Sequence, residues 1–192
     1  MHLYLMRHGH DQRDAQRARD DDRVLSATGA LQAQAGAHLL RGASITHLRT
    51  SRLLRAQQTA DHVGQVLGLP WQVDARLDEV GTGLHGQQMP QPPRLLRAAD
   101  GADAWSRYVH AIGDLLHELT FANQGAGAHL WVCHSGTLDA LFEAVTGTRG
   151  EVELAMAHGA LTHWQYRPGA RDGAWLLHSH NVSPQVVSTR AA

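Results

Sequence analysis

The chain has 192 residues, a hydrophobic fraction of 43%, and 17 basic against 18 acidic side chains, for a formal net charge of −1. This length fits one domain over residues 1–192 with a buried core, and the balanced charge argues against general binding to nucleic acid or to a membrane surface. Cys133 is the single cysteine, which excludes an intramolecular disulfide; because the sequence also shows neither a signal-peptide pattern nor an apolar run of membrane-spanning length, we predict a cytoplasmic protein.

The first predicted strand covers residues 3–6 and runs directly into Arg7, His8 and Gly9. Arg7 offers a planar cation whose donors suit phosphate. His8 offers an imidazole that is nucleophilic when neutral, as it is near pH 7. Gly9 lets the backbone bend close to a ligand. We therefore predict that this turn is the centre of the functional site.

Two helices and a strand are predicted next. Ser26 is typical of a helix N-cap and precedes an Ala-, Gln- and Leu-rich helix over residues 27–40. A strand over residues 45–50 follows, and Ser51 is predicted to cap the second helix. Arg55 then lies in the first turn of that helix, where a side chain can reach a ligand beyond the sheet. On position alone, the alternative is an ordinary surface arginine.

A short strand over residues 71–73 leads into residues 74–100, which are rich in Gly and Pro and lack a regular period. We predict an irregular excursion that includes Glu79, and long loops of this kind often act as lids. The next helix is predicted from about residue 103 to 119, with apolar residues on one face.

A buried-type strand over residues 129–133 ends at Cys133 and is followed by His134 and Ser135 at the start of another helix. Such a helix start presents free amides and the positive end of the helix dipole, which suits a phosphate. Ser135 is predicted to cap this helix or to contact phosphate. Two further strands are predicted over residues 160–166 and 174–179.

Alternating strands and helices predict an α/β fold, a three-layer sandwich with a mostly parallel central sheet and helices on both faces. Ligands of such sheets bind beyond the carboxyl ends of the strands. The first and fourth strands deliver His8 and His134 to that edge, so we expect the two histidines to lie close together.

Five sequence blocks occur in a characteristic order. They are Arg-His-Gly at residues 7–9, Leu-Ser-Ala-Thr-Gly at 25–29, Thr-Ser-Arg-Leu-Leu-Arg-Ala-Gln-Gln-Thr-Ala at 50–60, Leu-Asp-Glu at 77–79 and Val-Cys-His-Ser-Gly at 132–136. In this order and spacing, over nearly the whole chain, the sequence resembles the histidine phosphatase superfamily, in its phosphoglycerate mutase-like branch. It departs from the usual pattern at His10 and Asp11, where an acidic residue and then Thr or Ser usually follow the Arg-His-Gly triplet.

The resemblance implies phosphoryl transfer on a small phosphorylated substrate, without a metal or other cofactor. His8 would attack phosphorus and form a phosphohistidine. Arg7, Arg55 and His134 would surround the phosphoryl oxygens, and two arginines with a histidine can supply that charge without a metal. Glu79 would protonate the leaving oxygen and then help water attack the phosphoenzyme.

The resemblance leaves three functions open. A phosphomonoester hydrolase of the histidine acid phosphatase type is the main prediction, because the chain is short for a glycolytic mutase and lacks the extra loops that close over a mutase substrate. The alternatives are a phosphoglycerate-type mutase and a non-catalytic phosphate- or phosphopeptide-binding module of the same fold. No pattern in the sequence predicts an oligomeric state.

The sequence offers two alternative sites, a cysteine nucleophile and a metal site built from histidines. Cys133 as a phosphatase nucleophile lacks an arginine at the phosphate-loop distance, since position 139 is Asp. A metal site built from histidines matches no zinc spacing; the histidines considered for it are His158, His163, His178 and His180. Substrate specificity is assigned to loops 10–24 and 80–100, whose arginines would favour an extra acidic group on the substrate. These arginines are Arg13, Arg17, Arg94 and Arg97.

Overall fold

The computed structural model describes residues 1–12, 23–79, 104–122, 127–148, 152–169 and 174–184. Its strands are β1 (His2–Arg7), β2 (His47–Thr50), β3 (Trp71–Val73), β4 (Ala128–Cys133), β5 (Leu161–Arg167) and β6 (Ala174–Val182). Its helices are α1 (Ala27–Leu39), α2 (Leu54–Leu67), α3 (Ala104–Ala122) and α4 (Ser135–Thr146), with a 3-10 turn η2 (Ala75–Leu77). Each predicted strand and helix therefore exists, with bounds shifted by a few residues.

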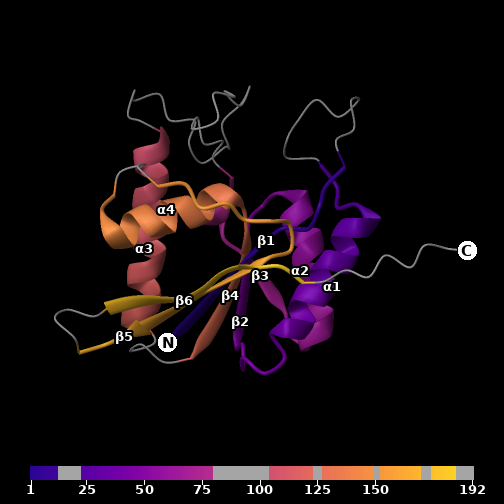
Figure 1. Ribbon diagram of the computed structural model, residues 1–192, viewed down its shortest axis with the longest axis horizontal. Coiled ribbons are helices and arrows are strands. Elements are labelled where there is room, and N and C mark those ends of the chain that lie inside the picture. Colours follow the sequence, from indigo (N-terminus) through magenta and orange to yellow (C-terminus); the bar gives the residue numbers. More distant parts are fainter. Residues whose placement is uncertain (13–22, 80–103, 123–126, 149–151, 170–173, 185–192) are drawn as a thin grey trace, which may run out of the picture.

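The strands form one sheet of six in the order β3-β2-β4-β1-β5-β6. β3, β2, β4 and β1 are mutually parallel, and β5 and β6 add an antiparallel hairpin at one edge. Figure 1 shows α1 and α2 on one side of the sheet and α3 and α4 on the other. The predicted three-layer sandwich with a mostly parallel sheet is thus confirmed.

The core has two halves because successive side chains of a strand point to opposite faces of the sheet. Leu3 and Leu5 of β1 pack with residues of α3 and α4, including Tyr108 and Leu138. Met6 of β1 packs with residues of α1 and α2 on the other face. Burial on both faces fixes β1 as a central strand, and its carboxyl end therefore lies in the middle of the sheet.

The helix ends confirm two predictions and correct two. Ser26 caps α1, since its side chain accepts from the Gly29 amide, and Gly68 ends α2 with a φ of 68°. Ser51 does not cap α2: the cap is Leu53, which is extended and makes no side-chain capping bond. Ser135 does not cap α4 either, since it is the first helical residue and His134 is the N-cap.

The turn η2 gives shape to the start of the excursion predicted from residue 74. Its cap, Asp74, accepts from the Arg76 amide and pairs with the guanidinium of Arg76 at 2.7 Å and that of Arg49 at 3.3 Å. Glu118 of α3 accepts from both arginines, so this group ties the turn to β2 and α3. Among the described helices, none is long and apolar enough to cross a bilayer.

His129 on β4 predicts a pH dependence of stability. It is 2% exposed and stacks on His47 at a centroid distance of 4.6 Å; burial, then the nearby His47 and Arg49, lowers its pKa to about 4. As the pH falls below about 6.5, the unfolded chain binds a proton that the folded chain does not. Proton binding to His129 in the unfolded chain should therefore lower the free energy of unfolding by about 2 kcal/mol at pH 5. We expect His129→Gln to show a shallower decline from pH 7 to pH 5 in urea unfolding; parallel curves for variant and wild type would contradict this.

Candidate active site

The carboxyl ends of β1 and β4 bring two histidines together. β1 and β4 are parallel neighbours with Arg7 opposite Cys133, and the His8 amide continues this pairing by donating to the Cys133 carbonyl at 2.9 Å. The next side chains, His8 and His134, are buried with their ring centroids 5.1 Å apart. The register of the sheet, set by the core residues before it, is therefore what places the pair.

The hydrogen bonds of His8 fix its tautomer. Its Nδ1 lies 2.8 Å from the Gly9 carbonyl, which can only accept, so Nδ1 carries the proton. Its Nε2 accepts from the Nε–H of Arg55 at 3.2 Å. Burial, followed by the nearby His134 and Arg55, holds the pKa of His8 well below its ordinary value. At neutral pH His8 is thus an uncharged imidazole whose Nε2 lone pair faces a guanidinium.

Two arginines, the buried Arg55 and the half-buried Arg7, concentrate positive charge around that lone pair. Arg55, in the first turn of α2, is 1% exposed. Arg7 donates from its guanidinium to the Met156 carbonyl, and its buried Nε has no hydrogen-bond partner within the described part of the chain. Burial lowers the pKa of Arg7, which the carboxylates of Glu79 and Asp11 oppose. A largely buried cation with an unused donor, as at Arg7, is typical of an anion site.

His134 and Glu79 form the opposite wall. Nε2 of His134 lies 2.9 Å from Ser51 Oγ, and its Nδ1 lies 3.9 Å from Oε2 of Glu79. Burial, then Arg55 and Arg7, holds the pKa of His134 well below its ordinary value. Glu79 comes after Asp78, the residue that ends η2, and its side chain is 12% exposed. The structure thus gathers Arg7, His8, Arg55, Glu79 and His134, all of which the sequence singled out.

Gly9, predicted to lie against the phosphate, has a packing role in the turn. Its amide donates to Thr59 Oγ1 at 3.1 Å, so this N–H is already used. A Cβ at this position would come within 2.3 Å of the Gly29 carbonyl oxygen. The glycine therefore allows the start of α1 to approach the turn. Ser135, at the first position of α4, is half-buried.

Two residues next to Arg55 and His8, Asp11 and His158, were not predicted as site residues. Asp11 pairs with Arg23 at 2.9 Å and lies 3.9 Å from Arg55 Nε. His158 donates from Nδ1 to the His8 carbonyl at 3.1 Å, with its ring 5.1 Å from that of His8. No local pattern marks these residues, because the contacts are made between distant parts of the chain. The loop arginines proposed as specificity residues, at positions 13, 17, 94 and 97, lie outside the described residues.

The structure argues against the two rival sites. Cys133 is buried in the core, and burial raises the pKa of its thiol to about 12, so the reactive thiolate is disfavoured. The four histidines proposed as metal ligands do not meet at one point. His163 stacks between Tyr4 and His178, whereas His180 bonds Thr162. No cluster of three or more side chains that could hold a metal occurs within the described ranges.

Comparison with known proteins gives a family match over most of the chain. The model of the histidine phosphatase superfamily (branch 1) matches residues 3–182. Among curated proteins, the chain is 36% identical over 86 residues to a probable phosphoglycerate mutase GpmB of Salmonella choleraesuis and 37% identical to that of Yersinia enterocolitica. Each match covers 44% of this chain and 40% of the relative, so the similarity spans about two fifths of these relatives.

Solved structures show the same fold at low identity. A mycobacterial glucosyl-3-phosphoglycerate phosphatase complexed with VO3 aligns with a TM-score of 0.73 and 22% identity, over 95% of this chain and 99% of that chain. A putative alpha-ribazole-5'-P phosphatase from Escherichia coli aligns at 0.72 and 21%, over 97% and 98%. The protein histidine phosphatase SixA, complexed with tungstate, aligns at 0.67 and 24%, over 96% and 97%. At these identities the likeness establishes the architecture alone.

Proposed function

The chain belongs to the histidine phosphatase superfamily, and on this premise we propose that it hydrolyses a small phosphomonoester through a phosphohistidine at His8, without a metal. The observation that carries the proposal is the state of His8, a neutral imidazole with a proton on Nδ1 and a lone pair on Nε2. That lone pair faces the buried guanidinium of Arg55. A phosphoryl group requires such positive charge while it is transferred.

In the first step Nε2 of His8 attacks phosphorus, and the bond between phosphorus and the leaving oxygen breaks. Arg55 gives up its hydrogen bond to Nε2 and donates to a phosphoryl oxygen. Arg7 and His134 contact the other phosphoryl oxygens. The phosphorylated ring retains its Nδ1 proton and is cationic, and the Gly9 carbonyl at 2.8 Å stabilises it. Glu79 gives its proton to the leaving oxygen, which becomes the alcohol.

In the second step Glu79, now a carboxylate, takes a proton from water, and the water oxygen attacks the phosphohistidine. The phosphorus–nitrogen bond breaks, inorganic phosphate forms, and His8 and Glu79 return to their starting states. A mutase would use the same site but return the phosphoryl group to another hydroxyl of the substrate. The three solved structures above are named as phosphatases, one of them as putative, which supports the hydrolase. The names of the curated relatives support the mutase.

Phosphate release tests the proposal. We expect the purified protein to release inorganic phosphate from p-nitrophenyl phosphate and from a panel of small phosphomonoesters, at rates unchanged by a chelator. Exchange of phosphate between positions of phosphoglycerate, without net release, would favour the mutase. A protein that binds phosphate or a phosphopeptide but performs neither reaction would be the non-catalytic module.

A further inference from the structure

An ion pair between the exposed Arg52 and the buried Asp78 lies next to Glu79 in the chain. The carboxylate of Asp78 is 4% exposed and contacts Arg52 in three ways. Its Oδ1 accepts from the Arg52 amide at 2.8 Å, and its Oδ2 accepts from the guanidinium Nε at 2.7 Å and lies 2.6 Å from NH2. Charge-assisted bonds that hold both oxygens fix a carboxylate in place and in orientation. The peptide that leads into Glu79 is thereby anchored.

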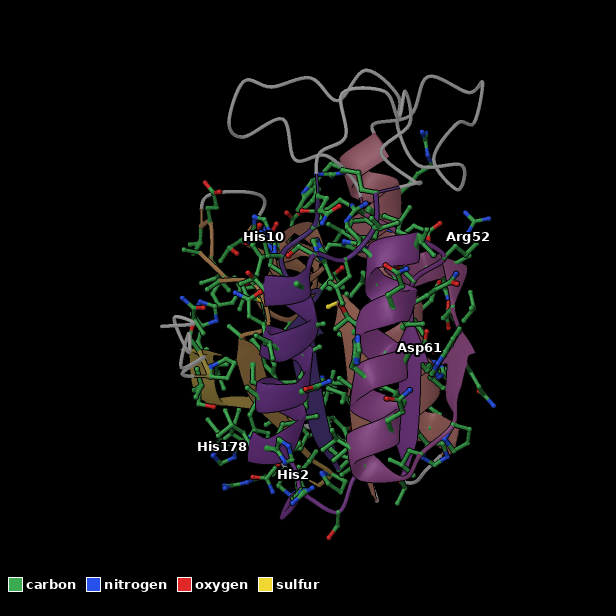
Figure 2. The ribbon with its side chains drawn as sticks, turned by 90° about the vertical axis from the view of Figure 1, so that its right-hand side faces the viewer. His2, His10, Arg52, Asp61 and His178 are labelled. Carbon is green, nitrogen blue, oxygen red and sulfur yellow. The ribbon has the colours of Figure 1, made fainter. Side chains whose placement is uncertain are left out.

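The other end of this ion pair belongs to the turn that holds the rest of the site. Arg52 directly follows Ser51, whose hydroxyl bonds Nε2 of His134, and precedes the first turn of α2, which carries Arg55. Figure 2 shows Arg52 at the same end of the molecule as His10, beyond the carboxyl ends of the strands. The pair therefore links the segment of the proton donor to the segment that orients the phosphate-binding groups.

A general acid is sensitive to such an anchor. It must lie within hydrogen-bond reach of the leaving oxygen, and a misplacement of about 1 Å can cost on the order of 10²-fold in rate. Glu79 lies just beyond η2, a turn of only three residues. The contacts of Asp78 restrain the residue directly before it.

We propose that Asp78 and Arg52 are positioning residues that set the place of the Glu79 carboxyl relative to the leaving oxygen. Neither side chain takes part in the proposed bond-making steps. The inference rests on the proposed function, in which Glu79 protonates the leaving group. If Asp78 and Arg52 act in this way, variants of either residue should lose more kcat/KM on substrates whose leaving oxygen must be protonated than on substrates whose leaving group departs without a proton.

The test compares two substrates in each variant. Asp78→Asn keeps the shape and an oxygen for the Arg52 amide but removes the charge that holds the guanidinium. We expect kcat/KM to fall about tenfold for glycerol phosphate, whose alkoxide needs protonation, and less than about twofold for p-nitrophenyl phosphate, whose phenolate leaves unaided. Glu79→Gln calibrates the assay and should change the ratio between substrates by about 10²-fold. Arg52→Ala should resemble Asp78→Asn, and Arg52→Lys should recover part of the loss.

Asp74→Asn is the matched control. Asp74 is an ion-paired carboxylate of the same turn, bound to Arg76 and Arg49, so its loss loosens the turn without touching the Asp78–Arg52 pair. We expect Asp74→Asn to lower the melting temperature about as much as Asp78→Asn does. The ratio of kcat/KM between the two substrates should stay at the wild-type value. Equal losses on both substrates in Asp78→Asn, or the same ratio change in Asp74→Asn, would overturn the positioning role while His8-dependent hydrolysis stood. A wild-type protein without phosphate release would overturn the proposed function and this inference with it.

Discussion

Replacing His8 by alanine is expected to lower phosphate release by on the order of 10⁴-fold or more, because it removes the atom that attacks phosphorus. Nε2 of His8 is the only nitrogen of the buried histidine pair whose lone pair is fixed by its hydrogen bonds to face Arg55. The remaining cations can still bind the phosphoryl group, so binding of the phosphate analogue vanadate should persist. Initial rates with p-nitrophenyl phosphate in the presence of EDTA measure the loss.

The control for this variant is His62→Ala, which removes an imidazole from the same fold outside the site. His62 lies on α2 with its Nδ1 3.4 Å from the side-chain amide of Gln34, and its loss should leave the rate within about twofold, as expected for a surface position. Rapid quenching of the wild type should trap a phosphoenzyme that is labile to acid and stable to alkali, and His8→Ala should not form it. Release that survives His8→Ala would place the nucleophile elsewhere.

The main site residues could be predicted because they follow strand ends. The apolar runs before Arg7 and His134 mark buried strands, and parallel neighbours in one sheet bring their carboxyl ends together. Once the strands are recognised, the meeting of the two histidines is a consequence of the sheet. Arg55 needed more than this, because a helical arginine is usually exposed, and only the resemblance to a family favoured a buried role over a surface one.

The parts that could not be predicted depend on contacts between distant segments. By local rules a serine just before a helix is predicted to cap it. Ser51 instead forms a hydrogen bond with His134, 83 residues further along the chain. His158 reaches the His8 carbonyl across a separation of 150 residues. Gly9 follows the same logic, since the close approach of Gly29, 20 residues away, requires its lack of a side chain. Local pattern decides which elements form, whereas tertiary contacts decide how the side chains between them are used.

Replacing Arg55 by methionine is expected to lower kcat/KM by about 10³-fold, since a cation over the transferring phosphoryl group contributes on this scale. Arg55 is fully buried, and its Nε–H touches the attacking nitrogen, so no solvent ion or neighbouring side chain can take its place. Methionine fills a similar volume without charge. Asp11 keeps its pairing with Arg23 at 2.9 Å, so the variant does not leave that carboxylate without a counter-charge.

The same variant should raise the pKa of His8. Burial is the largest cause of its lowered pKa, and the nearby His134 and Arg55 add to it. Removal of Arg55 takes away one repulsive charge, so the charged imidazolium becomes less unfavourable. NMR titration of the ring protons of His8 should show the midpoint move upward in Arg55→Met while it stays below the ordinary value of about 6.5, because the burial remains.

Asp61→Asn separates this effect from a general disturbance of α2. Asp61 lies on the same helix, where it accepts from the Trp71 indole at 2.8 Å, and Figure 2 shows it away from the end that carries Arg52. We expect this control to leave both kcat/KM and the His8 titration at wild-type values. A loss of rate in Arg55→Met without a shift in the His8 titration would mean that Arg55 acts on the bound phosphoryl group alone. An unchanged rate would contradict the assignment of Arg55 to the site, because a buried guanidinium that serves no anion only adds a desolvation cost.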